Sequence, residues 1–237
     1  MKIKEILNFL DEISPFELQE NWDNSGLLVG DLKKDIKKVY ISLDLDKELL
    51  DNIANNSLII AHHPLIFKLI KAIDYNVHKL LIKLIKKDIS FIAMHTNFDK
   101  THLNRYVAEN ILGLTGENKE FIYIAEVNKT FDEIAKEIKE KLGINYLKVV
   151  KCKGFIKKLA ITTGSGMSLL PFIDVDLFLT GDIKYHDAMD AKIRGISLID
   201  IGHFESEKFF VDIMYESIKD LKVEVIKTNS KNPFAII

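Results

Sequence analysis

Strand-like and helix-like segments alternate along most of this chain, and this alternation limits the possible fold more than any other feature. Apolar runs of strand length occur in KKVYISLDLD, SLIIAHHP and SFIAMHTNFD, and helical patterns in DKELLDNIANN and HKLLIKLIKKD separate them. A helix that connects two consecutive strands usually places them parallel in one sheet. The sequence therefore predicts an α/β fold with mostly parallel sheets.

The alternation is interrupted around residues 115–128, where a second set of units begins. TFDEIAKEIKEKLG is helical and ends at Gly143, and strand runs follow in YLKVVKC, KKLAITTGSG, DLFLTGD and ISLIDIGH. A long helix, ESEKFFVDIMYESIKDL, and the strand VEVIKT can return to the first lobe. We therefore expect two interlinked α/β domains, the first formed by residues 1–122 plus 204–237 and the second by 123–203.

Composition narrows the class of protein. The 237 residues are 47% hydrophobic, which is ample for a buried core, and 33 basic against 35 acidic residues give no basic excess for nucleic-acid binding. The N-terminal segment has helical spacing with acidic interruptions, and no run is long enough to span a bilayer. Cys152 is the one cysteine, so neither an internal disulfide nor a thiolate-rich metal site is possible. We expect a cytoplasmic protein in which nitrogen and oxygen atoms bind any metal.

Several apolar strand runs end in polar residues that can bind metals. In open α/β sheets, ligands bind beyond the carboxyl ends of the strands, where residues distant in sequence converge. His62 and His63 follow LIIA directly, and Pro64 stiffens the turn after them. Two readings of this pair are equally favoured: both imidazoles bind ions, or both cap the strand edge with hydrogen bonds to the backbone.

Two further segments pair a histidine with a carboxylate at a spacing of four residues. His203 and Glu207 share one face of a helical turn, so Glu207 is favoured as a ligand over an ordinary acidic helix start. In MHTNFD, Asp99 is the favoured ligand. His95 is left with three possible roles: ligand, orienting residue or proton carrier. His78 and His102 are expected to be ordinary surface residues.

Together these segments predict a site for two divalent ions. One catalytic zinc typically takes three protein ligands, and this set is larger. Two ions about 3.5–4 Å apart would activate a water molecule and polarise the substrate. The identity of the metal is not readable, and zinc, iron and manganese all suit these donors. The predicted ligands are His62, His63, Asp99, His203 and Glu207.

Other residues near strand ends have open roles. Asp44, Asp182 and His186 are candidates for orienting ligands or transferring protons, and exposed turns explain the two aspartates equally well. The glycines of TTGSG, Gly164 and Gly166, suit a phosphate-binding turn, although a plain tight turn is favoured. We take His95 and His186 as the candidate catalytic residues.

The set of motifs resembles the type-2 GTP cyclohydrolase homologues, also called the Nif-three-like family. The matching segments are NWDNSGLLVG, LIIAHHPLIF, AMHTNFDK, TTGSG, FLTGDIKYHDAMDAK and IDIGHFESEK. The resemblance implies the same five ligands, a di-metal site facing a cavity, and a homo-oligomer in the form of a hexameric ring. The chain lacks room for the extra domain of longer members, and Phe204 stands where the family often has a second histidine.

The resemblance also implies a small-molecule substrate, because ring opening of GTP with loss of formate is ascribed to some members of the family. A metal-dependent hydrolase acting on a nucleotide or related phosphorylated compound is our first hypothesis. A non-enzymatic metal-binding scaffold or metal-handling protein is the alternative. Nucleic acid and membrane are not expected partners.

Overall fold

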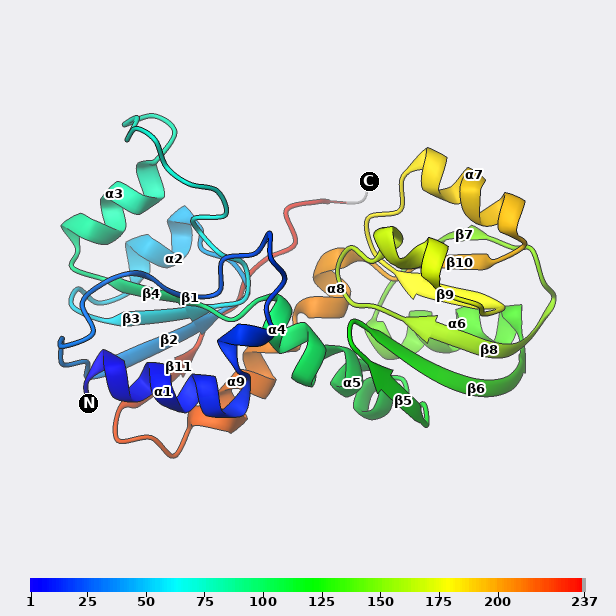
Figure 1. Ribbon diagram of the computed structural model, residues 1–237, viewed down its shortest axis with the longest axis horizontal. Coiled ribbons are helices and arrows are strands. Elements are labelled where there is room, and N and C mark those ends of the chain that lie inside the picture. Colours follow the sequence, from blue (N-terminus) through cyan, green and yellow to red (C-terminus); the bar gives the residue numbers. More distant parts are fainter. Residues whose placement is uncertain (236–237) are drawn as a thin grey trace. The chain divides into compact units, whose positions relative to one another are not determined.

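The structure, a computed structural model, describes residues 1–235 and contains two sheets in two compact units (Figure 1). Unit 1 is Met1–Phe98 with Phe210–Lys231, and unit 2 is Asp99–Phe209 with the segment that begins at Asn232. The mixed α/β class and the largely parallel pairing at the centre of the sheets confirm the predicted fold class. None of the described helices combines the length and apolar character that a bilayer span requires.

Unit 1 contains a five-stranded sheet in the order β1-β4-β3-β2-β11, in which only β1 runs antiparallel to its neighbour. Its strands are β1 (Gly26–Val29), β2 (Lys38–Ser42), β3 (Leu58–Ala61), β4 (Ser90–Ala93) and β11 (Glu224–Lys227). Its helices are α1 (Ile3–Ile13), the short 3-10 turn Phe16–Leu18, α2 (Lys47–Asn52), α3 (Lys79–Lys86), α4 (Thr96–Phe98) and α9 (Phe210–Ile218).

Helices cover both faces of this first sheet. Leu50 of α2 and Leu84 of α3 pack with Ile59 and Phe91 on one face, and Figure 1 shows α1 and α9 on the other. The four residues of β3 are all buried, which explains why this strand is a continuous apolar run rather than an alternating one. A central strand of this kind gives the residues that follow it, His62 and His63, a rigid base.

Unit 2 contains a six-stranded sheet in the order β5-β6-β8-β9-β10-β7. The pairs β8·β9 and β9·β10 are parallel, and the outer pairings are antiparallel. Its strands are β5 (Gly116–Lys119), β6 (Ile122–Thr130), β7 (Lys148–Val150), β8 (Phe155–Ile161), β9 (Leu177–Thr180) and β10 (Ser197–Asp200). Its helices are α5 (Asn104–Tyr106), α6 (Phe131–Leu142), the 3-10 helix Met167–Phe172, α7 (Tyr185–Arg194) and α8 (His203–Glu207), with π-helical segments at Asp99–Leu103 and Val107–Ile111.

Local sequence accounts for α6 in detail. Thr130 and Glu133 form a reciprocal capping box at its start, and Gly143 ends it with a φ of 71°. Its apolar positions Phe131 and Ile138 are buried, as the helical spacing predicts. On the opposite side of the same sheet, α7 packs through Ala191, and the 3-10 helix through Leu170.

The unit boundaries differ from those expected from sequence. The chain leaves unit 1 after Phe98 and returns at Phe210, whereas the sequence suggested 122/123 and 203/204. The buried side chain of Asn104 explains the first shift. Its Nδ2 donates to the carbonyl of Phe121 at 3.0 Å, and its Oδ1 accepts from the backbone N–H of Thr163 at 2.8 Å. These bonds hold the segment that follows Phe98 on the second sheet.

In three segments the observed secondary structure differs from the secondary structure predicted from the sequence. The helix expected over ESEKFFVDIMYESIKDL is divided into α8 and α9, whose bounds leave out Lys208 and Phe209. The interruption predicted around residues 115–128 contains the hairpin β5–β6. In MHTNFD the strand stops at Ala93, and helical turns begin at Thr96. As expected, α9 and β11 return to the first sheet, where β11 pairs with β2.

Candidate metal-binding residues

His62 and His63 continue the line of β3 beyond its carboxyl end. Their backbone N–H groups donate to the carbonyls of Ser42 and Leu43, at 3.3 and 3.2 Å. The two side chains then have different partners. Nδ1 of the fully buried His62 lies 2.8 Å from the carbonyl oxygen of Met94, to which it donates. This hydrogen bond directs Nε2, the other ring nitrogen, away from the Met94 carbonyl.

Nδ1 of His63 lies 2.7 Å from Oδ1 of Asp44, a residue that follows the neighbouring strand β2. Asp44 is one of the aspartates whose role the sequence leaves open, and its carboxylate is the Nδ1 partner of His63. Histidines that bind metals usually donate their second ring N–H to a carboxylate or a backbone carbonyl in this way. The His62 bond to the Met94 carbonyl also fits the alternative, in which the pair caps the strand edge through backbone hydrogen bonds, so the choice of His62 and His63 as ligands stays a prediction.

A carboxylate also contacts Nδ1 of His95, and it belongs to Asp23, a residue that the sequence analysis does not single out. Nδ1 of His95 lies 2.7 Å from Oδ1 of Asp23, whose side chain is completely buried. Asp23 Oδ2 also accepts from the backbone N–H of Thr96 at 3.0 Å and from the Ser25 hydroxyl at 3.2 Å. Nothing in the spacing of WDNSG relates it to a histidine 72 residues later, so only the fold could reveal this pair.

The electrostatics of Asp23 follow from these contacts. Burial opposes ionisation, but the hydrogen bond and charge of His95 outweigh it, with help from Thr96 and the N–H of Asn24. Together they hold the pKa of Asp23 well below its ordinary value. Asp23 is therefore a carboxylate at neutral pH, and it favours a proton on Nδ1 of His95.

The three histidines of unit 1 form one cluster. Ring centroids are 5.0 Å apart for His62 and His63, 5.2 Å for His62 and His95, and 5.6 Å for His63 and His95. One ring nitrogen from each lies within 4.8 Å of the others. His95 therefore keeps two of the roles that the sequence leaves open, metal ligand and proton carrier.

Unit 2 holds His203 and Glu207, which lie on α8. His203 Nε2 lies 3.0 Å from Glu207 Oε2, and His203 Nδ1 lies 2.7 Å from Asp182 Oδ2. Burial disfavours the charged form of His203, but the two carboxylates outweigh it and raise the pKa of His203 to about 9. Asp182 has a left-handed φ of 56°, an uncommon conformation for a residue other than glycine. Its role is open from sequence, and in the structure its carboxylate is the Nδ1 partner of His203.

The TTGSG turn fits closely around Glu207. Gly164 has a φ of 62°, and a Cβ atom placed on it would overlap Glu207 Oε1 and lie 3.4 Å from His203 Nε2. The N–H of Gly164 donates to the Ser206 hydroxyl at 3.0 Å, and that of Gly166 donates to the Thr180 hydroxyl at 2.8 Å. Both N–H groups thus have protein acceptors, and the turn packs closely against the Glu207 carboxylate.

Asp99 begins the first π-helical segment, directly after α4. One of its carboxylate oxygens lies within 4.8 Å of one from Glu207. Irregular π turns inside helices are frequently found at functional sites, since they shift a side chain without ending the helix. Within unit 2, two carboxylates and one histidine thus lie close together.

The remaining histidines lie in other surroundings. His186 is exposed in the first turn of α7 and makes an edge-on contact with Tyr185, with ring centroids 5.3 Å apart. It belongs to none of the ligand-type groups among the described residues, and its proposed catalytic role stays a prediction. His78 accepts from the N–H of Asp74. His102 is half-buried, and burial together with the charge of Arg105 lowers its pKa.

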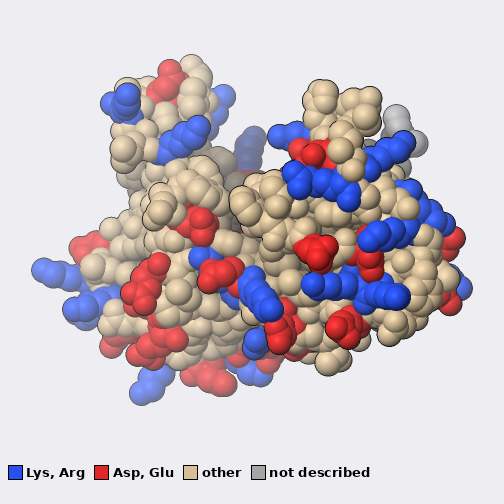
Figure 2. All heavy atoms as spheres, turned by 45° about the vertical axis from the view of Figure 1, so that its right-hand side comes forward, with Lys and Arg blue, Asp and Glu red and all other residues tan. Residues whose placement is uncertain are grey.

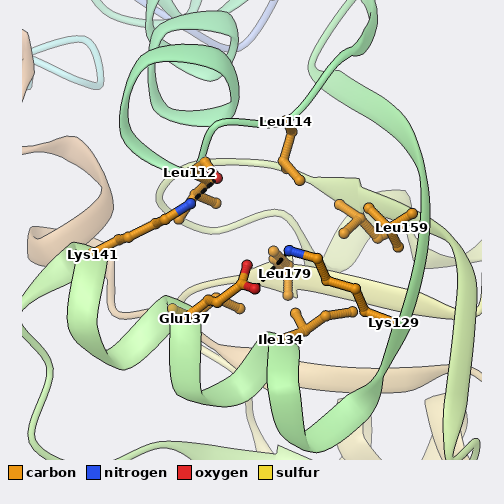
Figure 3. A pocket seen from close by; sticks show the side chains of 10 residues that line it. Leu112, Leu114, Lys129, Ile134, Glu137, Lys141, Leu159 and Leu179 are labelled. Atoms are coloured by element: carbon orange, nitrogen blue, oxygen red, sulfur yellow. Dashed lines mark hydrogen bonds and ion pairs between the residues drawn. The ribbon is translucent and has the colours of Figure 1, made fainter.

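Figure 3 shows a small pocket in unit 2. Ile134 of α6 and Leu159 and Leu179 of the sheet line it, and Lys129 and Glu137 form a 2.6 Å ion pair across it. It contains none of the predicted ligands. Its apolar lining and closed ion pair are those of a packing gap beneath α6.

Surface charge agrees with the composition. On the face shown in Figure 2, basic and acidic side chains are interspersed. Many pairs are close enough to neutralise each other, for example Lys151 with Asp132 at 2.7 Å and Lys153 with Asp176 at 2.5 Å.

Comparisons with known proteins agree over nearly the whole chain. A model of the family described as Duf34/NIF3 (NGG1p interacting factor 3) matches residues 1–233. A Campylobacter jejuni protein named GTP cyclohydrolase 1 type 2 homolog is 48% identical over 239 residues, 99% of each chain. A Helicobacter pylori protein named GTP cyclohydrolase 1 type 2 is 42% identical over 240 residues, again 99% of each. Among solved structures, reduced HcgD from Methanocaldococcus jannaschii matches with a TM-score of 0.84 at 28% identity, over 96% of this chain and 97% of that one.

Proposed function

Because this chain belongs to the Duf34/NIF3 family, we propose that it binds two divalent metal ions and uses them to hydrolyse a nucleotide or a related phosphorylated compound. The ligands in this proposal are those predicted from sequence. They are His62, His63, Asp99, His203 and Glu207. Zinc, iron and manganese suit this mixture of nitrogen and oxygen donors, and the protein would work in the cytoplasm.

The anchored imidazoles are the main support. Each of His62, His63 and His203 has Nδ1 fixed by a carbonyl or carboxylate, which makes Nε2 the atom that would bind a cation. The turn at Gly164, which leaves no space for a Cβ beside Glu207, supports a precise position for that carboxylate as well.

Chain connectivity supports joint use of the two sets of donors. Asp99 follows His95 by four residues, so their Cα atoms can be at most about 15 Å apart. Glu207 precedes Phe210 by three residues, a reach of about 11 Å, and the Phe210 ring packs on His62 with centroids 5.0 Å apart. Both places where the chain passes between the units are thus next to proposed ligands.

The protein residues would divide the work of hydrolysis. Divalent ions, when bound, would lower the pKa of a water molecule and polarise an oxygen or nitrogen of the substrate. His95, held by Asp23 through Nδ1, can accept a proton at Nε2 and deliver it to the leaving group. His186 is the second candidate for moving protons, from its exposed place on α7. The names of the Campylobacter and Helicobacter relatives support GTP as the first substrate to test.

Metal content and product release test this function separately. We expect about two ions per chain by elemental mass spectrometry, and formate, phosphate or an altered purine on incubation with GTP and related nucleotides. His63→Ala should lose metal and turnover, whereas His78→Ala, a histidine outside the site, should keep both. Circular dichroism must show that both variants fold.

Two outcomes would count against the proposal. Metal bound without any product above the His63→Ala background would favour the non-enzymatic scaffold, and chelation should then lower the melting temperature. Absence of bound metal after incubation with zinc, iron or manganese would reject the site itself. The hexameric ring is a further prediction, and light scattering should then give six times the chain mass of 27.2 kDa.

A further inference from the structure

Two exposed aromatic side chains flank the histidine cluster of unit 1. Trp22, the one tryptophan of the chain, is 57% exposed, and Phe67 is 42% exposed. Their ring centroids are 5.7 Å apart with an interplanar angle of 38°. Both present an edge-on contact to His95, at 6.2 Å for Trp22 and 6.1 Å for Phe67. We call Trp22 and Phe67 the aromatic wall.

Hydrogen bonds hold the two loops of the wall in place. Asn24 Nδ2 donates to the carbonyl of Ile66 at 2.5 Å, which ties the residues beside Trp22 to those beside Phe67. On the other side of Trp22, buried Asp23 is held by Thr96, and its N–H donates to the carbonyl of Glu20 at 2.9 Å. Single exposed aromatic residues are common, but two from separate loops, fixed against the same imidazole, form a preorganised surface.

We propose that the aromatic wall stacks the planar heteroaromatic ring of the substrate, a nucleobase or similar ring, and presents that ring rather than a phosphate to the histidine cluster. This inference rests on the proposed function, because it names the part of the substrate that faces the same site. Base stacking on aromatic side chains is favourable for every base, since each has a π face.

The geometry also determines how the ring binds. A ring sandwiched between Trp22 and Phe67 would need roughly 7 Å between them, twice the contact distance of stacked carbon atoms. At 5.7 Å these two rings instead touch each other. The substrate ring therefore stacks on the exposed face of the indole, and Phe67 supports the indole from its side. A ring in this position is next to His95.

Tryptophan fluorescence measures this binding directly, because Trp22 is the only tryptophan. The full-length protein is titrated with GTP, with guanosine and with inorganic triphosphate, each with and without a chelator. We expect saturable quenching by GTP and guanosine and none by triphosphate. Phe67→Leu retains the reporter and should raise the Kd of guanosine about tenfold.

Phe155→Leu is the matched control, because Phe155 is 49% exposed on β8 and should leave the Kd unchanged. Calorimetric titration of Trp22→Phe and Trp22→Leu gives a second measurement, in which only the leucine variant should lose affinity. A response to triphosphate without one to guanosine would overturn the inference. So would equal Kd values for the Phe67→Leu and Phe155→Leu proteins.

Failure of this inference can be distinguished from failure of the proposed function. Quenching by guanosine that depends on Phe67, but without product release from GTP, keeps the wall and rejects the hydrolase. Product release with a guanosine Kd unaffected by Phe67→Leu keeps the hydrolase and rejects the wall. Each variant is compared with the wild type by circular dichroism before titration.

Discussion

Gly164→Ala should separate the cost of an unusual backbone conformation from the cost of moving a metal ligand. Gly164 has a φ of 62°, and Gly195 has a φ of 71°. An alanine at either position adopts the left-handed conformation at a cost of about 1 kcal/mol. In a chain of this size, that cost should lower the melting temperature by about 2–4 °C.

The two sites differ in what the new methyl group meets. At Gly195 nothing lies within 4 Å, whereas at Gly164 the Cβ atom overlaps Glu207 Oε1. Glu207 is only 3% exposed, and Ser206 beside it accepts from the N–H of Gly164, so the carboxylate has to turn away from its position. We expect metal affinity to fall about 10- to 100-fold in Gly164→Ala, as it does when groups supporting a ligand are removed.

Calorimetry gives the melting temperatures, and competition with a metal-indicator dye gives the affinities. Gly195→Ala should show the loss of stability with wild-type metal affinity. If the two variants bind metal equally well, then the contact between the turn and Glu207 does not position a ligand, and the reasoning is wrong.

Three further predictions concern supporting residues. Because the folded pKa of Asp23 is lowered, its ionisation stabilises the fold above about pH 4 and is lost as the pH falls below that value. Asp23→Asn should therefore flatten the decline of the unfolding free energy in acid, measured by urea titration between neutral pH and pH 3, and an unchanged slope would contradict the role of the Asp23–His95 pair. Asp182→Asn should weaken metal binding about 10- to 100-fold, because Asp182 contacts Nδ1 of His203. Asp220→Asn, at an exposed position, should leave the metal affinity unchanged. Equal affinities for the two variants would exclude orientation of the His203 ring through Nδ1. Asn104→Ala leaves buried backbone groups without their partner and should cost about 1–3 kcal/mol of stability in urea unfolding, and a change below that range would mean that the segment after Phe98 is held by other contacts.

The sequence alone supported much of the fold. Buried strands such as LIIA and SFIA, and the capped helix 131–142, carry their own patterns, because a local period and a cap need only neighbouring residues. The hairpin at residues 116–130 was missed because its pattern of burial is mixed and it begins with exposed residues. The break near Lys208 in the last helix was missed because both halves keep helical spacing.

For the candidate site, local pattern and tertiary structure determine different things. The sequence by itself determined which residues are suited to bind metal, because strand ends and i,i+4 spacing place donors such as His203 and Glu207 together. Only the tertiary structure decided what orients them. Asp23 meets His95 across 72 residues, Asp44 meets His63 across 19, and Gly164 makes room for Glu207. Contacts at such separations depend on how strands and loops pack, and they leave no periodic signal in the chain.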